Sequence, residues 1–352
     1  MRGRIILLDA KGEFFIMTTI KDIAKKLDIS ISTVSKGLNG ASDISEEMQQ
    51  LVLDTALEMG YISKSKKTNA KKLKVAIIVE NIDYENINQF GYEIITGFRI
   101  AASEYQCEVE IVPVNMYLHS SKTYDTLMRQ HGFSGAFILG FELNDSYIKH
   151  LKATRLPTVL FDNYIPNPNI AYIGTDCTTG TKTLVQSLYN HGHRKIAILN
   201  GRKQSYITKL RLESYMQAFK EFGLTIDPDL IGYGNFEPDT AKEYVQSFIE
   251  SGASAIVCGN DLIASGVINE LHRLGKHVPN DISVVGFDDL PIAKYLAPPL
   301  TTIRQERFTL GKLAFSLLTN LINDIPISTM LVQSKFIERE SIGYVDSEKS
   351  NQ

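Results

Sequence analysis

Residues 17–40 read MTTIKDIAKKLDISISTVSKGLNG, and this stretch decides how the start of the chain folds. Thr19 is placed to cap a helix, and Asp22 three residues later completes a variant of the capping box. The apolar residues after it repeat at the spacing of one helical face: Ile20, Ile23, Ala24 and Leu27. We therefore predict a short helix with a small residue, Ala24, where a second helix crosses closely.

A second and a third helix follow at once. Ser30 caps the second, in which Val34 and Leu38 share a face, and Asn39-Gly40 is a stop signal because both residues tolerate positive φ. The third opens at Ser45-Glu46-Glu47 and ends at Gly60. Its predicted inward face is Met48, Leu51, Val52, Thr55 and Leu57 or Met59. Three such helices are typical of a DNA-binding unit, and the alternative is a helical cap that packs on protein.

The outward face of the second helix carries side chains suited to reading DNA. Ile31 suits a thymine methyl, Ser32 a base edge, and Lys36 a guanine or a phosphate. The predicted DNA contacts of this unit are Thr19, Ser30, Ile31, Ser32, Thr33, Ser35, Lys36 and Asn39.

Charge separates this head from the rest of the chain. The 352 residues suffice for two or three domains. Residues 17–74 hold ten lysines and seven acidic residues, a net charge of +3, whereas residues 75–352 hold 24 basic and 31 acidic residues, a net charge of −7. Phosphate repels the acidic body, so only the head is suited to nucleic acid.

The segment that joins them, residues 63–74, reads SKSKKTNAKKLK, with six lysines and no acid. It is interpreted either as a solvated connector or as a hinge that contacts phosphates. Residues 1–16 are expected to be an unstructured extension, from an upstream start or of non-native origin. Their apolar run is too short for a secretion signal.

Several function classes lack support. Cys107, Cys177 and Cys258 are odd in number and far apart, which favours a reducing, cytoplasmic setting without a disulfide framework. His191-Gly192-His193 is interpreted as a helix end and not as a metal site. The sequence shows no apolar run of membrane-spanning length, no G-x-S-x-G, no P-loop and no GxGxxG, so no catalytic residue, metal or cofactor is predicted.

From residue 75 short apolar runs alternate with amphipathic stretches. The expected strands are 75–79, 108–114, 135–140, 158–162 and 171–176, then 195–199, 230–234, 255–260 and 282–289. This rhythm predicts parallel sheets covered by helices, and its two series predict two lobes. Ligands of such folds bind outside the carboxyl ends of the strands.

Polar residues stand at those ends. Asp162, Asn260 and Asp288 each end an expected strand, and each is either the cap of the next helix or part of a ligand site. Carboxylates and amides that face one another across a cleft suit a polyhydroxylated ligand.

Thr-Ile-Lys-Asp-Ile-Ala, then Ile-Ser-Ile-Ser-Thr-Val-Ser-Lys-Gly-Leu-Asn-Gly, resembles the head of the lactose/galactose-repressor (LacI/GalR) family of bacterial transcription regulators. Asn260-Asp261, residues 278–289 and residues 299–303 resemble the body of that family. The resemblance implies a periplasmic-binding-protein-like body whose strands cross between lobes near 176, 304 and 335.

The resemblance also implies functional residues. Arg211 and Phe236 match effector contacts, which gives an effector set of Asp162, Arg211, Phe236, Asn260 and Asp288. Lys71 and Leu73 match a hinge helix whose leucine wedges into the minor groove. The chain departs from the family at Lys36, where arginine is commoner, at Glu213 in place of glycine, and at Glu306 in place of proline.

The resulting prediction is a homodimeric, ligand-responsive repressor that binds double-stranded operator DNA and a sugar or sugar derivative. A sugar-transport protein and an enzyme are the alternatives from other classes. The expected parts are an all-α helix-turn-helix head, an α/β two-lobed body and the segments that flank them: 1–16 extension, 17–62 head, 63–74 hinge, 75–343 body and 344–352 polar tail. Within the body, the N-lobe is expected at 75–175 and 305–335 and the C-lobe at 176–304 and 336–343.

Overall fold

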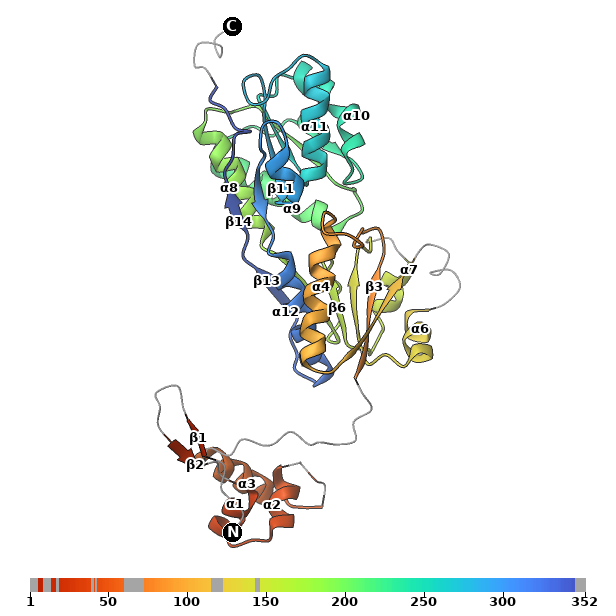
Figure 1. Cartoon of the computed structure of the whole chain (residues 1–352), viewed down its shortest axis with the longest axis vertical. Helices are drawn as coiled ribbons and strands as arrows, with labels where there is room; N and C mark the ends of the chain where they lie inside the picture. Colours follow the sequence, from red (N-terminus) through yellow and green to blue (C-terminus); the bar gives the residue numbers. More distant parts are fainter. Residues whose placement is uncertain are drawn as a thin grey trace. The chain divides into compact units, whose positions relative to one another are not determined.

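The computed structural model describes residues 6–8, 14–16, 19–38, 41, 43–59, 73–114, 123–142 and 146–345. The chain divides into two compact units, residues 1–70 and 71–352 (Figure 1). Each is described by itself.

The first unit contains the predicted three-helix head: α1 (Ile20–Leu27), α2 (Ile31–Leu38) and α3 (Glu46–Glu58). Thr19 and Asp22 form the predicted capping box of α1. The Ser30 hydroxyl accepts a hydrogen bond from the Thr33 amide at 3.0 Å and so caps α2. The helices pack around a small apolar core of Ile23, Ala24, Val34, Val52 and Ala56.

Two details of the head differ from the prediction. Leu51, which was predicted to face inward, is 48% exposed. Ala56, which was not predicted to face inward, is buried beside Thr55. The inward face of α3 is therefore formed by Val52, Thr55 and Ala56, and Leu51 lies outside it. The predicted stops at Asn39-Gly40 and Gly60 lie outside the described residues.

The N-terminal extension also differs from the expectation of an unstructured segment. β1 (Ile6–Leu8) and β2 (Phe14–Ile16) pair as antiparallel strands, with Ile6 opposite Ile16. Both strands are short apolar runs, a pattern that favours strand pairing.

The second unit has two lobes, each built on a six-stranded sheet. The first sheet has the order β13-β7-β6-β5-β3-β4 and is entirely parallel. Its strands are β3 (Lys74–Val79), β4 (Glu108–Pro113), β5 (Ala136–Leu139), β6 (Thr158–Phe161), β7 (Ile170–Thr175) and β13 (Thr329–Val332).

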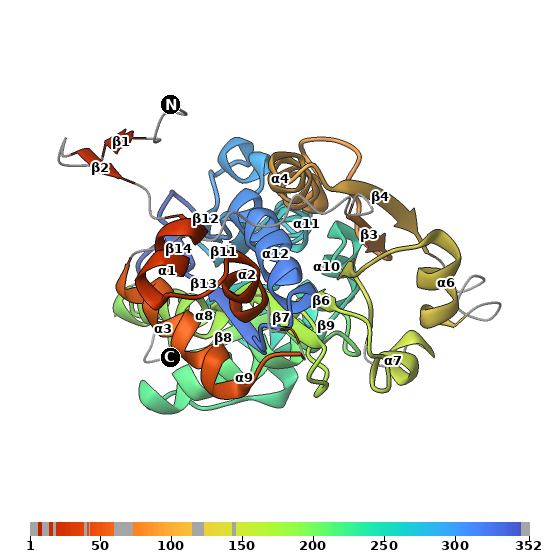
Figure 2. The same cartoon turned by 90° about the horizontal axis from the view of Figure 1, so that it is seen from below.

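Helices cover both faces of the first sheet. One face packs on α4 (Phe90–Glu104) and α12 (Arg307–Ile322), which lie side by side in both views (Figures 1 and 2). The other face buries Tyr124, Leu127 and Met128 of α6 (Tyr124–His131) and Leu151 of α7 (Ser146–Leu151).

The second sheet has the order β14-β12-β11-β10-β8-β9, and β14 alone runs antiparallel to its neighbour. Its strands are β8 (Ile196–Asn200), β9 (Ile231–Tyr233), β10 (Ala255–Cys258), β11 (Ser283–Asp288), β12 (Thr301–Arg304) and β14 (Lys335–Ile337). One face packs on α8 (Cys177–Asn190) and α9 (Tyr206–Glu221), and the other on α10 (Ala241–Glu250) and α11 (Asp261–Arg273). The predicted fold class is confirmed.

The chain crosses between the lobes three times: after β7, after β12, and between β13 and β14. These points lie next to the positions 176, 304 and 335 expected from the sequence. All nine expected strands are present, whereas β12, β13 and β14 were not expected as strands. β13 and β14 lie at sheet edges, are only four and three residues long, and contain no fully buried residue, unlike the inner strands.

The start of the body overlaps the last two residues of the predicted hinge. Lys74 begins β3 and forms an ion pair with Glu110 at 2.8 Å. Leu73 packs against the core of the first lobe, and its carbonyl accepts a hydrogen bond from the Glu108 amide at 2.8 Å. A leucine that inserts into the minor groove would have to leave this position, so the expected role of Leu73 stays a prediction. Lys71 and the other residues of the hinge lie outside the described part of the chain.

No helix in the described part of the chain is both long and apolar enough to cross a membrane.

Candidate functional site

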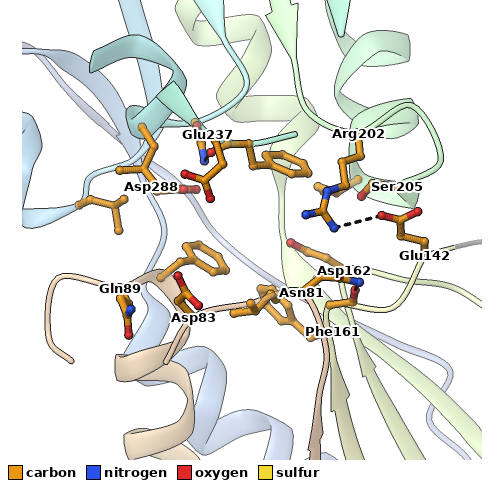
Figure 3. A pocket seen from close by; sticks show the side chains of 18 of the residues that line it. Asn81, Asp83, Gln89, Glu142, Phe161, Asp162, Arg202, Ser205, Glu237 and Asp288 are labelled. Atoms are coloured by element: carbon orange, nitrogen blue, oxygen red, sulfur yellow. Dashed lines mark hydrogen bonds and ion pairs between the residues drawn. The ribbon is translucent and has the colours of Figure 1, made fainter. Parts of the chain in front are cut away.

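A cavity of about 470 Å³ opens between the two lobes of the body (Figure 3). Its walls come from loops that follow the carboxyl ends of strands in both sheets, which is where open parallel sheets bind ligands. Aromatic and aliphatic side chains line it beside many polar ones, a mixture suited to a small organic molecule.

The structure brings all five predicted effector residues together in this cavity. Asp162 follows β6 in the first lobe. The second lobe supplies one residue from α9, one after β9, one after β10 and one at the end of β11: Arg211, Phe236, Asn260 and Asp288.

Arg211 is the central charge of this group, and its side chain is 7% exposed. One amino group donates to the Gly259 carbonyl, and the other lies 4.0 Å from Oδ1 of Asp288. The guanidinium also lies over the ring of Phe287, with its carbon 4.0 Å from the ring centroid. The nitrogen Nε of Arg211 is buried without a hydrogen-bond partner.

The two aspartates beside Arg211 resist ionisation. Burial raises the pKa of Asp162 to about 7, against the opposing effect of Arg211, and the charge of Asp288 adds to the rise. Burial raises the pKa of Asp288 to about 6, although Arg211 and a hydrogen bond from Gln305 favour the carboxylate. Oδ1 of Asp162 is buried and has no hydrogen-bond partner. A hydroxyl or amine of a ligand is the group that would satisfy it.

Asn260 caps a helix and also lines the cavity. Its Oδ1 accepts from the Ile263 amide at 2.8 Å at the start of α11, and its Nδ2 donates to the Phe236 carbonyl at 3.1 Å. The ring of Phe236 lies against Gly201, where a Cβ would approach the ring to 2.0 Å. Glycine at 201 is thus required for the ring to take this place.

The backbone is strained at three of the five residues. Asp162, Phe236 and Asp288 have φ values of 50°, 68° and 114°, in the region that favours glycine. Such conformations cost free energy and concentrate at functional sites, where the surrounding fold imposes them. Here they direct the three side chains into the cavity wall.

Several cavity residues were missed by the sequence analysis. Asn81 and Asp83 follow β3, Glu142 follows β5, and Arg202 follows β8. The rule that identified Asp162 applies to them equally, because all stand just after the carboxyl end of a strand. Arg202 of the second lobe and Glu142 of the first form an ion pair at 3.1 Å, drawn as a dashed line in Figure 3.

Two other strand-end acids have structural roles. Asp261 is fully buried and accepts from the Leu290 amide at 2.7 Å and from the Thr302 hydroxyl at 2.6 Å. Asp289 forms ion pairs with Arg304 at 2.7 Å and Arg339 at 2.6 Å. Neither lines the cavity.

The two positions where the chain departs from the family pattern in the body differ in importance. Glu213 is exposed on α9 and lies 3.9 Å from Lys209. Glu306 is exposed, whereas its neighbour Gln305 is buried and bridges the lobes. The Gln305 amide accepts from Thr175 at 2.6 Å and donates to Oδ1 of Asp288 at 2.6 Å.

The predicted DNA contacts in the head fall into three groups. Ile31 is 48% exposed and Ser32 is exposed, so both are accessible on the outer face of α2. Thr19, Ser30 and Thr33 use their hydroxyls in helix caps. Ser35 is half-buried, and Asn39 lies outside the described residues.

Lys36 has a partner that the sequence analysis did not anticipate. Its ammonium group forms a hydrogen-bonded ion pair with Asp43, in the segment between α2 and α3. This contact lowers the pKa of Asp43. Both side chains are about half exposed, so the pair is accessible to DNA.

His191-Gly192-His193 directly follows the last residue of α8, with His191 as the C-cap and Gly192 at a φ of 92°. His193 is buried, with Nδ1 2.9 Å from the Ser254 hydroxyl and Nε2 3.0 Å from the Gly343 carbonyl. Burial lowers its pKa to about 4. Within the described residues, no cluster of three or more His, Cys, Asp and Glu suits a metal ion.

The two units match two family models. Residues 19–64 match the model of bacterial regulatory proteins of the lacI family, and residues 185–342 match that of a periplasmic binding protein-like domain. The chain is 28% identical to the HTH-type transcriptional repressor CytR of Escherichia coli (strain K12) over 305 residues, which cover 85% of this chain and 88% of that protein.

Two solved structures share the fold. A complex of the transcriptional regulator CelR with cellobiose has a TM-score of 0.68 at 24% identity and covers 92% of this chain and 99% of its own. The lac repressor dimer bound to operator and the anti-inducer ONPF has a TM-score of 0.67 at 22% identity. The match covers 93% of this chain and 99% of the lac repressor chain.

Proposed function

Because this chain belongs to the LacI/GalR family of DNA-binding transcriptional repressors, and is a regulator and not an enzyme, we propose that a small sugar-like ligand in the interlobe cavity controls its affinity for operator DNA. The observation that carries the proposal is the convergence of Asp162, Arg211 and Asp288 with two further predicted residues on one cavity. The buried Oδ1 of Asp162 and Nε of Arg211 have no hydrogen-bond partner, and they suit ligand hydroxyl groups.

The head supplies the DNA-binding half of the proposal. Ile31, Ser32 and Lys36 on α2 are the proposed readers of the major groove, and the lysines of residues 63–72 are proposed to contact phosphates. The chain acts as a homodimer in the cytoplasm, so two heads bind the two half-sites of a pseudo-palindrome. The similar CelR structure is a complex with cellobiose, and the similar lac repressor structure is a dimer bound to operator, which supports these partners.

Ligand and DNA are coupled through the lobes. A ligand that favours one lobe arrangement changes how the two heads of the dimer are spaced. A differential affinity of about 1–3 kcal/mol between the two arrangements is sufficient for a useful response.

A gel-shift titration tests the proposal. The purified chain is titrated onto DNA from upstream of its own gene at low salt, with and without a panel of sugars. We expect a shifted band whose midpoint changes with one class of sugar. A chain that shifts no DNA under any of these conditions would contradict the proposal.

A further inference from the structure

Acidic side chains outnumber basic ones in the interlobe cavity. The basic side chains that line it are Arg202 and Arg211. The acidic side chains are Asp83, Glu142, Asp162, Glu237 and Asp288. The surplus of acids bears directly on the charge of the molecule that the cavity accepts.

The two arginines are already engaged with acids. Arg202 pairs with Glu142 at 3.1 Å, and Arg211 lies 4.0 Å from Asp288. Asp162 also lies within the electrostatic influence of Arg211, which opposes the rise in its pKa. Each arginine therefore already has an acidic partner within the protein and offers less attraction to an anionic ligand.

Asp83 and Glu237 are the acids that remain. Asp83 lies in the loop between β3 and α4, and Glu237 precedes the short 3-10 helix η2 (Pro238–Thr240) of the other lobe. Both are exposed, and neither forms an ion pair within the part of the chain that the structure describes. In Figure 3 their carboxylates face the cavity from opposite sides.

A second observation indicates that this region receives a ligand. The side chain of Arg211 is only 7% exposed, yet its Nε has no hydrogen-bond partner. Oδ1 of Asp162 is likewise buried and without a partner. A donor and an acceptor left unsatisfied in the wall of one cavity fit a molecule that carries both hydroxyl donors and acceptors.

We propose that the ligand is a small polyhydroxylated ring with a positively charged amino group, that is, an amino sugar, and that its ammonium group binds between Asp83 and Glu237. This inference rests on the proposed function and specifies its ligand. A neutral sugar leaves the two facing carboxylates without a counter-charge. A phosphorylated sugar adds negative charge to a cavity that already has a surplus of it.

Ligands that differ in one group test the charge requirement. The full-length chain is titrated in a calorimeter at pH 7 with glucosamine, N-acetylglucosamine, glucose and glucose 6-phosphate, and then with the galactose counterparts. N-acetylation keeps a nitrogen at the same carbon but removes its charge. In at least one series we expect the amine to bind about tenfold or more tightly than its acetylated and neutral partners, with the phosphate weakest.

Two variants and a matched control locate the ammonium site. Asp83→Asn and Glu237→Gln are each expected to reduce the preference for the amine over the neutral sugar by about threefold to tenfold. Asp239→Asn removes the same charge two residues from Glu237, on a side chain that is 82% exposed and paired with Lys242, and should keep the wild-type preference.

Equal or tighter binding of the neutral or phosphorylated sugars would overturn the proposal, and so would a panel in which nothing binds. An amine preference that all three variants retain would also overturn it, since the charge would then be read elsewhere. The gel shift on DNA is measured in parallel. A chain that binds DNA but no amine contradicts this ligand class alone, whereas a chain that binds no DNA contradicts the proposed function.

Discussion

Asp162 places a carboxyl group in the cavity wall where burial raises its pKa to about 7. The ordinary pKa of this group is 3.8. Between pH 3.8 and about 7, Asp162 therefore keeps its proton in the folded state but has lost it in the unfolded state. Stability from this group is present at low pH and is lost as the pH rises through the folded-state pKa.

Asp162→Asn tests this sign. The amide stays neutral at all pH values, so the variant should gain stability relative to the wild type as the pH rises from about 5.5 to about 8. Thermal unfolding of both ligand-free proteins across this range measures the difference in Tm. A difference in Tm that does not change with pH would show that Asp162 has an ordinary pKa.

Lys36 is the proposed DNA reader whose environment the sequence did not reveal. Its ion pair with Asp43 holds the ammonium group beside a carboxylate. When DNA binds, its phosphates must either displace this carboxylate from Lys36 or lie close to its negative charge. An exposed pair of this kind contributes little to stability, so its effect should appear mainly in DNA binding.

We expect Asp43→Asn to tighten operator binding by about twofold to tenfold, because it frees Lys36 and removes a charge that repels phosphate. Lys36→Ala should weaken operator binding. In the Lys36→Ala background, Asp43→Asn should tighten operator binding by less than it does in the wild type. Fluorescence anisotropy over a range of salt concentrations measures both effects. Asp54→Asn, on an exposed residue of α3 bonded to Gln50 at 2.9 Å, is the control. Similar gains from Asp43→Asn and Asp54→Asn would mean that general charge, and not Lys36, is responsible.

At the scale of elements, α4 and α12 cross at backbone contact because each has a glycine at the crossing. A Cβ at Gly97 would lie 2.1 Å from the Phe308 carbonyl oxygen, and one at Gly311 would lie 1.9 Å from that of Ile94. Since backbone cannot yield as a flexible side chain does, the helices must separate to admit a methyl group.

Gly311→Ala should therefore destabilise the body by about 1–3 kcal/mol, even though alanine favours helix. Urea unfolding of the purified chain measures the loss. Lys312→Ala changes the exposed neighbour and should alter stability by no more than about 0.5 kcal/mol. Equal stability of Gly311→Ala and the wild type would mean that the crossing is looser than described.

At the scale of the whole molecule, Gln305 joins the two lobes beside the cavity. It accepts from Thr175 at the end of β7 in the first lobe and donates to Asp288 in the second. Arg307 adds a second link, because it donates to the Asp288 carbonyl at 2.6 Å and pairs with Glu93 of α4 at 3.0 Å. A ligand that contacts Asp288 is thereby connected to both lobes.

Gln305→Leu keeps the size of the side chain but removes both interlobe hydrogen bonds. We expect ligand binding to weaken by about tenfold or less, while the ratio of operator affinities with and without saturating ligand moves toward one. Calorimetry and DNA titration, with the sugar that binds best, measure the two quantities separately. Glu306→Gln, on the exposed neighbour, should retain the response. An unchanged ratio for Gln305→Leu would show that the lobes are coupled elsewhere.

Short-range patterns in the sequence determined much of this molecule. Apolar periodicity located the helices of the head and nine strands, and capping chemistry fixed the start of α1. Asp162, Asn260 and Asp288 were recognisable because they end strands, while Arg211 and Phe236 required the family resemblance. The helices, the strands and the strand-end residues can be predicted from sequence because helix periodicity, caps and strand ends depend on residues that are neighbours in the chain.

Tertiary structure alone decided which distant residues meet. Glu142 and Arg202 are 60 positions apart, and Thr175 and Gln305 are 130 apart. Nothing in the local sequence of either partner specifies the other, because many acids and hydroxyls offer the same chemistry. These pairings form only when the lobes fold and the chain crosses between them. The same holds for the packing of Leu73 on the first lobe and for the facing carboxylates of Asp83 and Glu237. The sequence thus determined which residues stand at the strand ends, and the two-lobed fold decided which of them share a cavity.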